Sequence, residues 1–162
     1  IALGKLGQLG LLLKLYKHIL IPREVYNEVV VNGTRIGATD ASAVKRIVDK
    51  GRILVEEVML SEGDRQALSI IDVGEAEVIA LAKERKATWV LIDNEHARKI
   101  ARFRGLPLKG TIGILIEAFR RGFLSQEEIE LLVGEIQARP EFWISARLCD
   151  YALRAVSNEG DM

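Results

Sequence analysis

The sequence has almost none of the residues that build disulfides and zinc sites. Its 162 residues include one cysteine, Cys149, and two histidines, His18 and His96. A single cysteine excludes an internal disulfide and fits a reducing compartment, and so few sulfur and imidazole ligands exclude a typical zinc site. No apolar run is long enough to cross a membrane and no signal peptide is visible, so we expect a cytoplasmic protein.

The common signatures of nucleotide binding and serine hydrolysis are also missing. No segment has the spacing of a glycine-rich phosphate-binding loop, and no serine lies in a G-x-S-x-G elbow. The two histidines lie alone in the sequence, which is more typical of surface positions than of a catalytic base. The sequence therefore indicates no catalysis that depends on such a nucleophile.

The composition is that of an ordinary folded domain. Hydrophobic residues make up 49% and charged residues 28%, and the formal net charge is zero, which argues against general adhesion to nucleic acids. Helical segments alternate with short apolar segments, a pattern that predicts an α/β fold with a mostly parallel sheet. The length suits one domain, so we expect residues 1–162 to form a single domain.

Several local patterns define the expected elements. Residues 3–15 have leucines at helical spacing and are predicted to form one amphipathic helix. Residues 18–21 are expected to form a strand, and Asp40 or Thr39 to cap a helix that continues to Lys50. Ser125 and Glu128 have the spacing of a capping box at the start of another helix.

Charge is distributed unevenly along the chain. Residues 56–77 carry seven acids against one base, whereas residues 98–121 carry seven bases against one acid. A metal site beside a phosphate-binding surface would have this pattern. Two solvated faces that pair with each other would have it too, and the sequence leaves both explanations open.

One stretch combines a helix, a strand and two candidate carboxylates. After Glu75, residues 76–83 form a helical run, and the apolar residues 88–92 predict a buried strand that ends in Asp93. A helix antiparallel to this strand returns its first turn toward the strand's carboxyl end, where the ligands of open α/β sheets bind. We therefore expect Glu75 and Asp93 to face one cleft.

Each of these acids also has a purely structural explanation. Asp93 could cap the helix that begins near Glu95, although Asn94 can fill that role. Glu75 forms an acidic version of a capping box with Asp72 and could serve only to satisfy backbone donors.

Glu28 is a third candidate carboxylate. It belongs to a helix expected at residues 23–31. A glutamate on a helix is usually exposed, and only its position beside the apolar face of this helix suggests that Glu28 points into a cleft. Carboxylate oxygens are hard ligands that suit Mg²⁺ or Mn²⁺, ions that activate water and stabilise the departing oxygen in phosphodiester hydrolysis. Clustered carboxylates near basic residues therefore indicate divalent-metal chemistry.

Several motifs together resemble the PIN-domain family and, within it, a VapC-like branch. They are the strand end VLID at residues 90–93, the segment GEAE at residues 74–77 and ILIPREVYNEVV at residues 19–30. Glu75 lies eighteen positions before Asp93, and Ala97-Arg98 and Gly110-Thr111-Ile112-Gly113 follow in the order seen in that branch. The resemblance covers nearly the whole chain and is specific as a set.

The resemblance implies a three-layer α/β/α PIN-like fold and a metal-dependent endoribonuclease, often the toxin of a toxin–antitoxin pair. It assigns metal ligation and catalysis to Glu28, Glu75 and Asp93, with Mg²⁺ or Mn²⁺ as cofactor. It implies RNA as substrate, a small antitoxin protein as partner and a homodimer. The alternative is a catalytically inactive PIN-like module that binds RNA or protein.

The resemblance also implies an acid that the sequence does not contain. The family's first acid lies at the end of an N-terminal strand, just before the position of residues 1–3, and the chain begins after that point. We expect this strand and its acid upstream of Ile1, and their loss would put metal binding and activity in doubt. Asn94 is a second departure, because members of the branch often carry another acid there.

Basic residues after the candidate strand are the predicted RNA contacts. We expect four side chains to bind phosphates: Arg98, Lys99, Arg102 and Lys109. The helix that begins at Thr111 could add backbone donors, although Thr111 is equally well explained as a plain N-cap.

Overall fold

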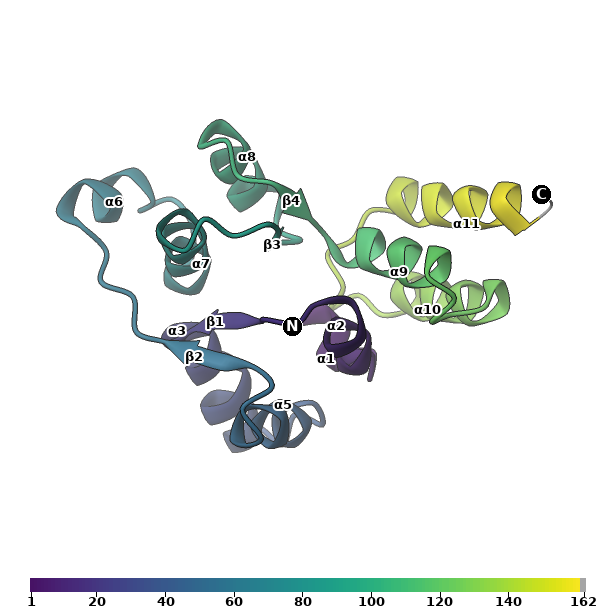
Figure 1. Cartoon of the computed structure of the whole chain (residues 1–162), viewed down its shortest axis with the longest axis horizontal. Coiled ribbons are helices and arrows are strands. Elements are labelled where there is room, and N and C mark those ends of the chain that lie inside the picture. Colours follow the sequence, from purple (N-terminus) through teal and green to yellow (C-terminus); the bar gives the residue numbers. More distant parts are fainter. Residues whose placement is uncertain (161–162) are drawn as a thin grey trace.

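The computed structural model describes residues 1–160 and has an α/β architecture (Figure 1). Strand β1 (Leu20–Pro22) pairs in parallel with β2 (Leu54–Glu56), and β3 (Val90–Leu91) pairs in parallel with β4 (Leu108–Lys109). The predicted α/β fold with parallel strands is confirmed. The expected central sheet is present as two separate pairs, because no strand pairing joins β1 to β3 within the described residues.

Helices connect and cover the strands. Those before β2 are α1 (Ala2–Lys5), α2 (Leu9–Leu15), α3 (Arg23–Tyr26), the π-helix η1 (Asn27–Asn32), α4 (Gly33–Arg35) and α5 (Ala41–Asp49). Those after β2 are α6 (Glu62–Ala67), α7 (Val73–Glu84), α8 (Glu95–Phe103), α9 (Thr111–Arg120), α10 (Gln126–Ala138) and α11 (Ala146–Gly160). None of the helices within residues 1–160 is long and apolar enough to span a bilayer.

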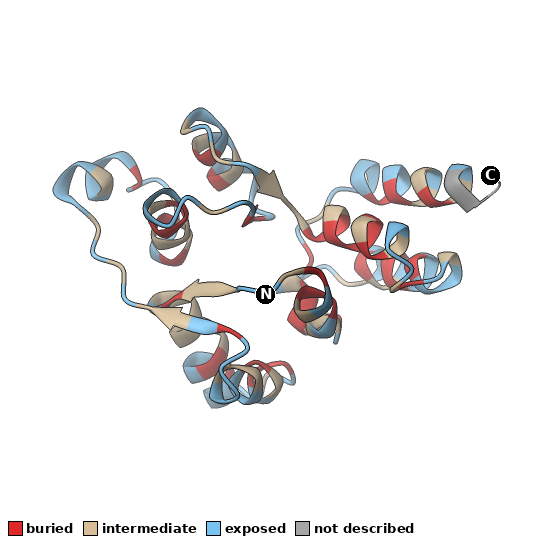
Figure 2. Ribbon diagram, viewed as in Figure 1, coloured by how far each residue is buried: buried red, intermediate tan, exposed pale blue. Residues whose placement is uncertain are grey.

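Buried side chains form two separate hydrophobic clusters (Figure 2). The larger cluster packs α1 and α2 against α9, α10 and α11, with Leu115 and Ile129 fully buried. The smaller one joins α7 and α8 to β3 through Ile79, Val90 and Ala97. Burial of a large aliphatic side chain stabilises the fold by about 1.5–3 kcal/mol. The smaller cluster therefore holds β3 against α7 and α8, and the larger one holds α9 against α1, α2, α10 and α11.

The predicted helix over residues 3–15 is wrong in one respect. The chain forms α1 and α2 there, because Gly7 adopts a left-handed backbone conformation with φ of +68° and interrupts the helical path. The predicted strand at residues 18–21 begins later, at Leu20. Asp40 occupies the N-cap position of α5 but its side chain makes no capping hydrogen bond.

Two predicted caps are confirmed. The Asn94 side chain accepts hydrogen bonds from the backbone N–H groups of His96 and Ala97, at 2.8 and 3.2 Å, and so begins α8. Ser125 and Glu128 form the reciprocal bonds of a capping box at the start of α10. Since Asn94 caps α8, Asp93 is not needed for that purpose.

Candidate functional site

Asp93 lies where the carboxyl ends of β3 and β4 meet. It follows β3, and Thr111, the first residue of α9, follows β4. The Thr111 backbone N–H donates to Asp93 Oδ1 and the Thr111 hydroxyl donates to Oδ2, both at 2.7 Å. The N-terminus of a helix favours an anion, so this contact holds an exposed carboxylate in a fixed orientation.

Gly110 makes the approach of Asp93 to α9 feasible. A Cβ at position 110 would lie 2.8 Å from Asp93 Oδ1, closer than nonbonded atoms tolerate, and would make a tight contact of 3.3 Å with Arg98 Nη1. The Gly110 backbone is extended, with φ of −108°, so any residue could adopt it. Glycine is required here by space and not by backbone conformation.

Glu75 lies in the first turn of α7 and has an unsatisfied oxygen. Its Oε2 is buried and has no hydrogen-bond partner among the described residues. Burial raises the pKa of Glu75, and the nearby charges of Asp72 and Glu28 raise it further, while a hydrogen bond from the Asp72 backbone lowers it. The capping box expected from the sequence is incomplete, because the Asp72 side chain makes no capping hydrogen bond at the start of α7.

Glu28 lies beside Glu75, on a helix of unusual geometry. It belongs to η1, and short π-helical segments occur frequently at functional sites. Its Oε2 lies 3.7 Å from the position that a Cβ on Gly74 would occupy, which places it against the first turn of α7. The structure therefore brings Glu28 and Glu75 together although they lie 47 positions apart in the sequence.

Ile1 lines two neighbouring cavities, one together with Asp40 and the other together with Asp93. Asp40 itself is only 7% exposed and packs against Gly4, where a Cβ would come within 2.9 Å of Asp40 Oδ2.

Of the three predicted ligands, Glu28 and Glu75 lie close together, and Asp93 lies at the start of α9. Within the part of the chain that the structure describes, no group of three acidic, histidine or cysteine side chains is placed to hold a metal ion. The chemistry of the donors nevertheless fits Mg²⁺ or Mn²⁺, because all are carboxylates and Glu75 keeps one buried oxygen that no described residue partners. The ligand set remains a prediction.

The predicted RNA contacts divide into two groups. Lys99 and Arg102 are exposed on α8. Arg98 is half-buried, and its Nη1 donates to the backbone carbonyl oxygen of Ile92 at 2.6 Å, which ties α8 to the end of β3. Thr111 is buried, and its N–H and hydroxyl are both used by Asp93.

Lys109 points into the protein interior. Its ammonium group forms an ion pair with Glu117, donates to the Tyr16 hydroxyl at 3.2 Å and lies 3.9 Å from the centre of the Trp89 ring. Burial acts to raise the pKa of Glu117, but hydrogen bonds from Lys109 and Tyr16 outweigh it and lower that pKa. Lys109 therefore links the residue after α2, the residue before β3 and the helix α9.

Comparison with known protein families agrees with this architecture. The sequence profile of a family described as a PIN domain matches residues 1–158. The chain belongs to the PIN-domain family. PIN domains are generally nucleases, so the chain is a member of a nuclease-type family. No curated protein and no solved structure matches the chain.

Sequence analysis missed two residues that shape this PIN-domain site. The sequence predicts Asp40 as an ordinary helix N-cap, and only its packing against Gly4 shows that it is buried. Gly110 was noted as part of a motif, but its proximity to Asp93 depends on how β3 and β4 lie side by side.

Proposed function

We propose that this PIN domain is a Mg²⁺- or Mn²⁺-dependent endoribonuclease of the VapC type, working in the cytoplasm as the toxin of a toxin–antitoxin pair. The observation that supports it best is the buried Oε2 of Glu75, which has no partner within residues 1–160 and lies near the Glu28 carboxylate. An unpaired carboxylate oxygen beside a like charge costs stability, and a divalent cation would offset that cost.

In this proposal Glu28, Glu75 and Asp93 hold the metal. When bound, the ion would lower the pKa of a water molecule and stabilise the negative charge on the leaving oxygen. Thr111 positions Asp93, because its two donors leave the remaining lone pairs of both oxygens free for a ligand.

The exposed basic side chains of α8 are the proposed RNA contacts. Lys99 and Arg102 lie on the helix that follows Asp93, so they could bind phosphates on either side of the scissile bond. Arg98 and Lys109 support the site from within through the contacts described above. Leu131 and Trp143, which are 75% and 92% exposed, offer apolar surface for contacts with a second subunit or with the predicted antitoxin.

Metal binding tests the proposal directly. Calorimetric titration of Mn²⁺ into the protein with its natural N-terminus should show binding that Asp93→Asn abolishes. Glu127→Gln is the matched control, because it removes one exposed carboxylate from α10, away from the site. Binding that survives in Asp93→Asn would contradict the assignment, and absence of binding in every form would favour the inactive RNA- or protein-binding module.

A further inference from the structure

Helix α8 carries one apolar side chain on an otherwise polar face. Its core side is formed by Ala97 and Ala101, which are fully buried in the smaller hydrophobic cluster. Five residues of the helix are exposed: Glu95, His96, Lys99, Arg102 and Phe103. Phe103 is the only apolar residue of the five, and its side chain is 93% exposed and packs on neither hydrophobic cluster. The packing of the fold therefore gives this ring no role.

Phe103 lies beside two cations that are free to bind a ligand. Lys99 is one helical turn before Phe103 on the same face, and Arg102 directly precedes it in the sequence. Neither side chain forms an ion pair or a hydrogen bond within the part of the chain that the structure describes. The other two basic side chains of this segment, Arg98 and Arg104, are held by internal partners. The free positive charge of α8 is therefore concentrated next to the exposed ring.

This exposed face of α8 begins at the candidate site. Asn94, which caps the helix, directly follows Asp93 in the sequence. Phe103 lies nine positions beyond Asn94, so at about 1.5 Å per residue it is roughly 13 Å along the helix, with Lys99 near the middle. At about 3.4 Å per stacked nucleotide, this length corresponds to about four nucleotides. A strand bound at Asp93 could therefore follow α8 as far as the ring.

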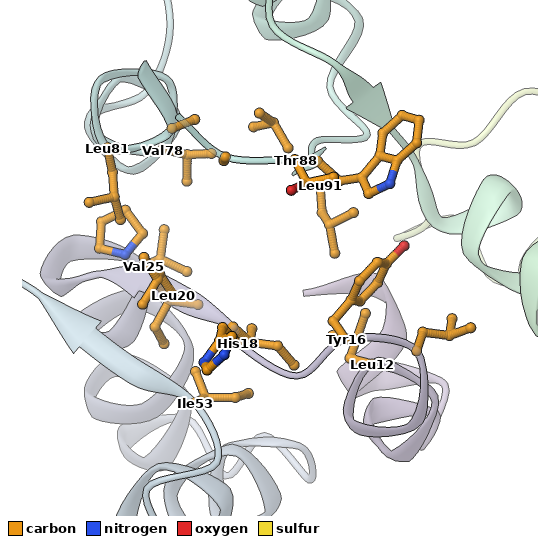
Figure 3. A pocket seen from close by; sticks show the side chains of 18 of the residues that line it. Leu12, Tyr16, His18, Leu20, Val25, Ile53, Val78, Leu81, Thr88 and Leu91 are labelled. Atoms are coloured by element: carbon orange, nitrogen blue, oxygen red, sulfur yellow. The ribbon is translucent and has the colours of Figure 1, made fainter. Parts of the chain in front are cut away.

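The groove between β1 and β3 lies elsewhere on the molecule (Figure 3). Its volume is about 680 Å³. Leu20 and Val25 face it from the side of β1, and Val78 and Leu91 face it from the side of β3. No residue of α8 lines this groove, and none of the three predicted metal ligands does. The groove is therefore not part of a path from the candidate site along α8.

We propose that Phe103 is a base-stacking residue, on whose ring an unpaired base of the bound RNA lies while Lys99 and Arg102 bind the adjacent phosphates. Every base has a flat face, so an aromatic ring beside cations holds a single strand whatever its sequence. The phosphate contacts fix the path of the strand and the ring fixes one base along it. This subsite rests on the proposed function, because it takes the RNA that the candidate site would cut.

Binding to two matched ligands tests the stacking. One ligand is a labelled single-stranded RNA of about twelve nucleotides, and the other is a chain of the same length that has the phosphates but no bases. Fluorescence anisotropy in a buffer with a metal chelator measures affinity without cleavage. We expect Phe103→Leu to weaken binding of the RNA about tenfold and to leave binding of the chain without bases unchanged, because leucine is apolar but has no flat ring. The dependence of affinity on salt should also stay unchanged, since no charge is removed.

Two further variants complete the test. Phe103→Trp should bind the RNA at least as tightly as the parent protein, because it keeps a flat ring. Tyr151→Leu is the matched control and should leave the affinity unchanged, because Tyr151 is also an exposed aromatic residue but lies on α11. Equal losses of affinity for both ligands in Phe103→Leu would overturn the proposal, because the effect would then not come from a base.

Cleavage assays separate this proposal from the proposed function. If the parent protein cuts RNA and Phe103→Leu binds the RNA as tightly as the parent, the stacking subsite alone is wrong. A ring that contacts a protein partner instead of RNA would give that result. If the parent neither binds nor cuts RNA, the subsite and the proposed function are both wrong.

Discussion

Asp93 and Thr111 are joined by two hydrogen bonds of 2.7 Å, although they lie eighteen positions apart in the sequence. One bond comes from the backbone N–H at the start of α9 and the other from the Thr111 hydroxyl. This pair fixes both oxygens of an exposed carboxylate at the junction of β3, β4 and α9. The contact connects the stability of this edge of the protein to the proposed chemistry.

We predict that Asp93→Asn abolishes RNA cleavage and lowers the free energy of unfolding by about 1–2 kcal/mol. The NH₂ group of the asparagine would face one of the two Thr111 donors and would not accept its hydrogen bond. Thr111→Val should cost about the same stability, since the hydroxyl bond is lost, but it should retain part of the cleavage rate because the backbone bond remains. Denaturant unfolding and single-turnover cleavage measure the two effects. An Asp93→Asn variant that cuts RNA at the parental rate would refute the assignment.

Gly110→Ala should displace Asp93. The added methyl group would meet Asp93 Oδ1 at 2.8 Å, so we expect a loss of about 1–3 kcal/mol in stability together with weaker Mn²⁺ binding. Gly134→Ala is the matched control, because it lies within α10 with open space around it and should stabilise the protein by about 0.5–1 kcal/mol. Equal effects from both substitutions would show that the Asp93 contact is unimportant.

Glu75→Gln should stabilise the protein at neutral pH. A raised pKa means that the folded state binds the Glu75 proton more tightly than the unfolded state does. The free energy of unfolding therefore falls as the pH rises from the ordinary glutamate pKa to the raised one, and the cost is complete above it. Removing the charge should raise the unfolding free energy at neutral pH by roughly 1 kcal/mol, or about 3 °C in melting temperature.

The same substitution should have little effect in buffer below the ordinary glutamate pKa, where the Glu75 proton is present in both states. Glu77→Gln serves as control: burial raises the pKa of Glu77 too, but its carboxylate accepts a hydrogen bond from the Glu24 N–H at 3.2 Å. Thermal melts across this pH range give the comparison. A gain from Glu75→Gln that is equal at both pH values would contradict the assigned cause.

The basic residues of α8 should separate into binding and structural roles. Lys99→Ala and Arg102→Ala should each weaken RNA binding and reduce the slope of log affinity against log salt by about 0.7, with stability unchanged. Arg98→Ala should instead lower the unfolding free energy by about 2 kcal/mol, because it removes the bond to the Ile92 carbonyl. If Arg98→Ala reduced the salt slope without loss of stability, Arg98 would be the RNA contact.

Much of the local structure followed from the sequence. Asn94 and the pair of Ser125 and Glu128 begin their helices as expected, because capping depends on residues only a few positions apart. Boundaries were less predictable: Gly7 divides the first helix, and β3 contains only two of the five apolar residues that suggested a strand. Those limits depend on backbone conformation and on a strand's partner, which lie outside the local pattern.

The sequence by itself determined the α/β class, the family motifs and the identity of the candidate acids, because periodicity, capping and motif order are local properties. Only the tertiary structure showed that Thr111 holds Asp93, that Arg98 and Lys109 point to internal partners, and that Asp40 is buried. It alone showed the groove between β1 and β3. These features arise where segments distant in sequence pack together, and side-chain burial and pairing are decided by that packing rather than by neighbours along the chain.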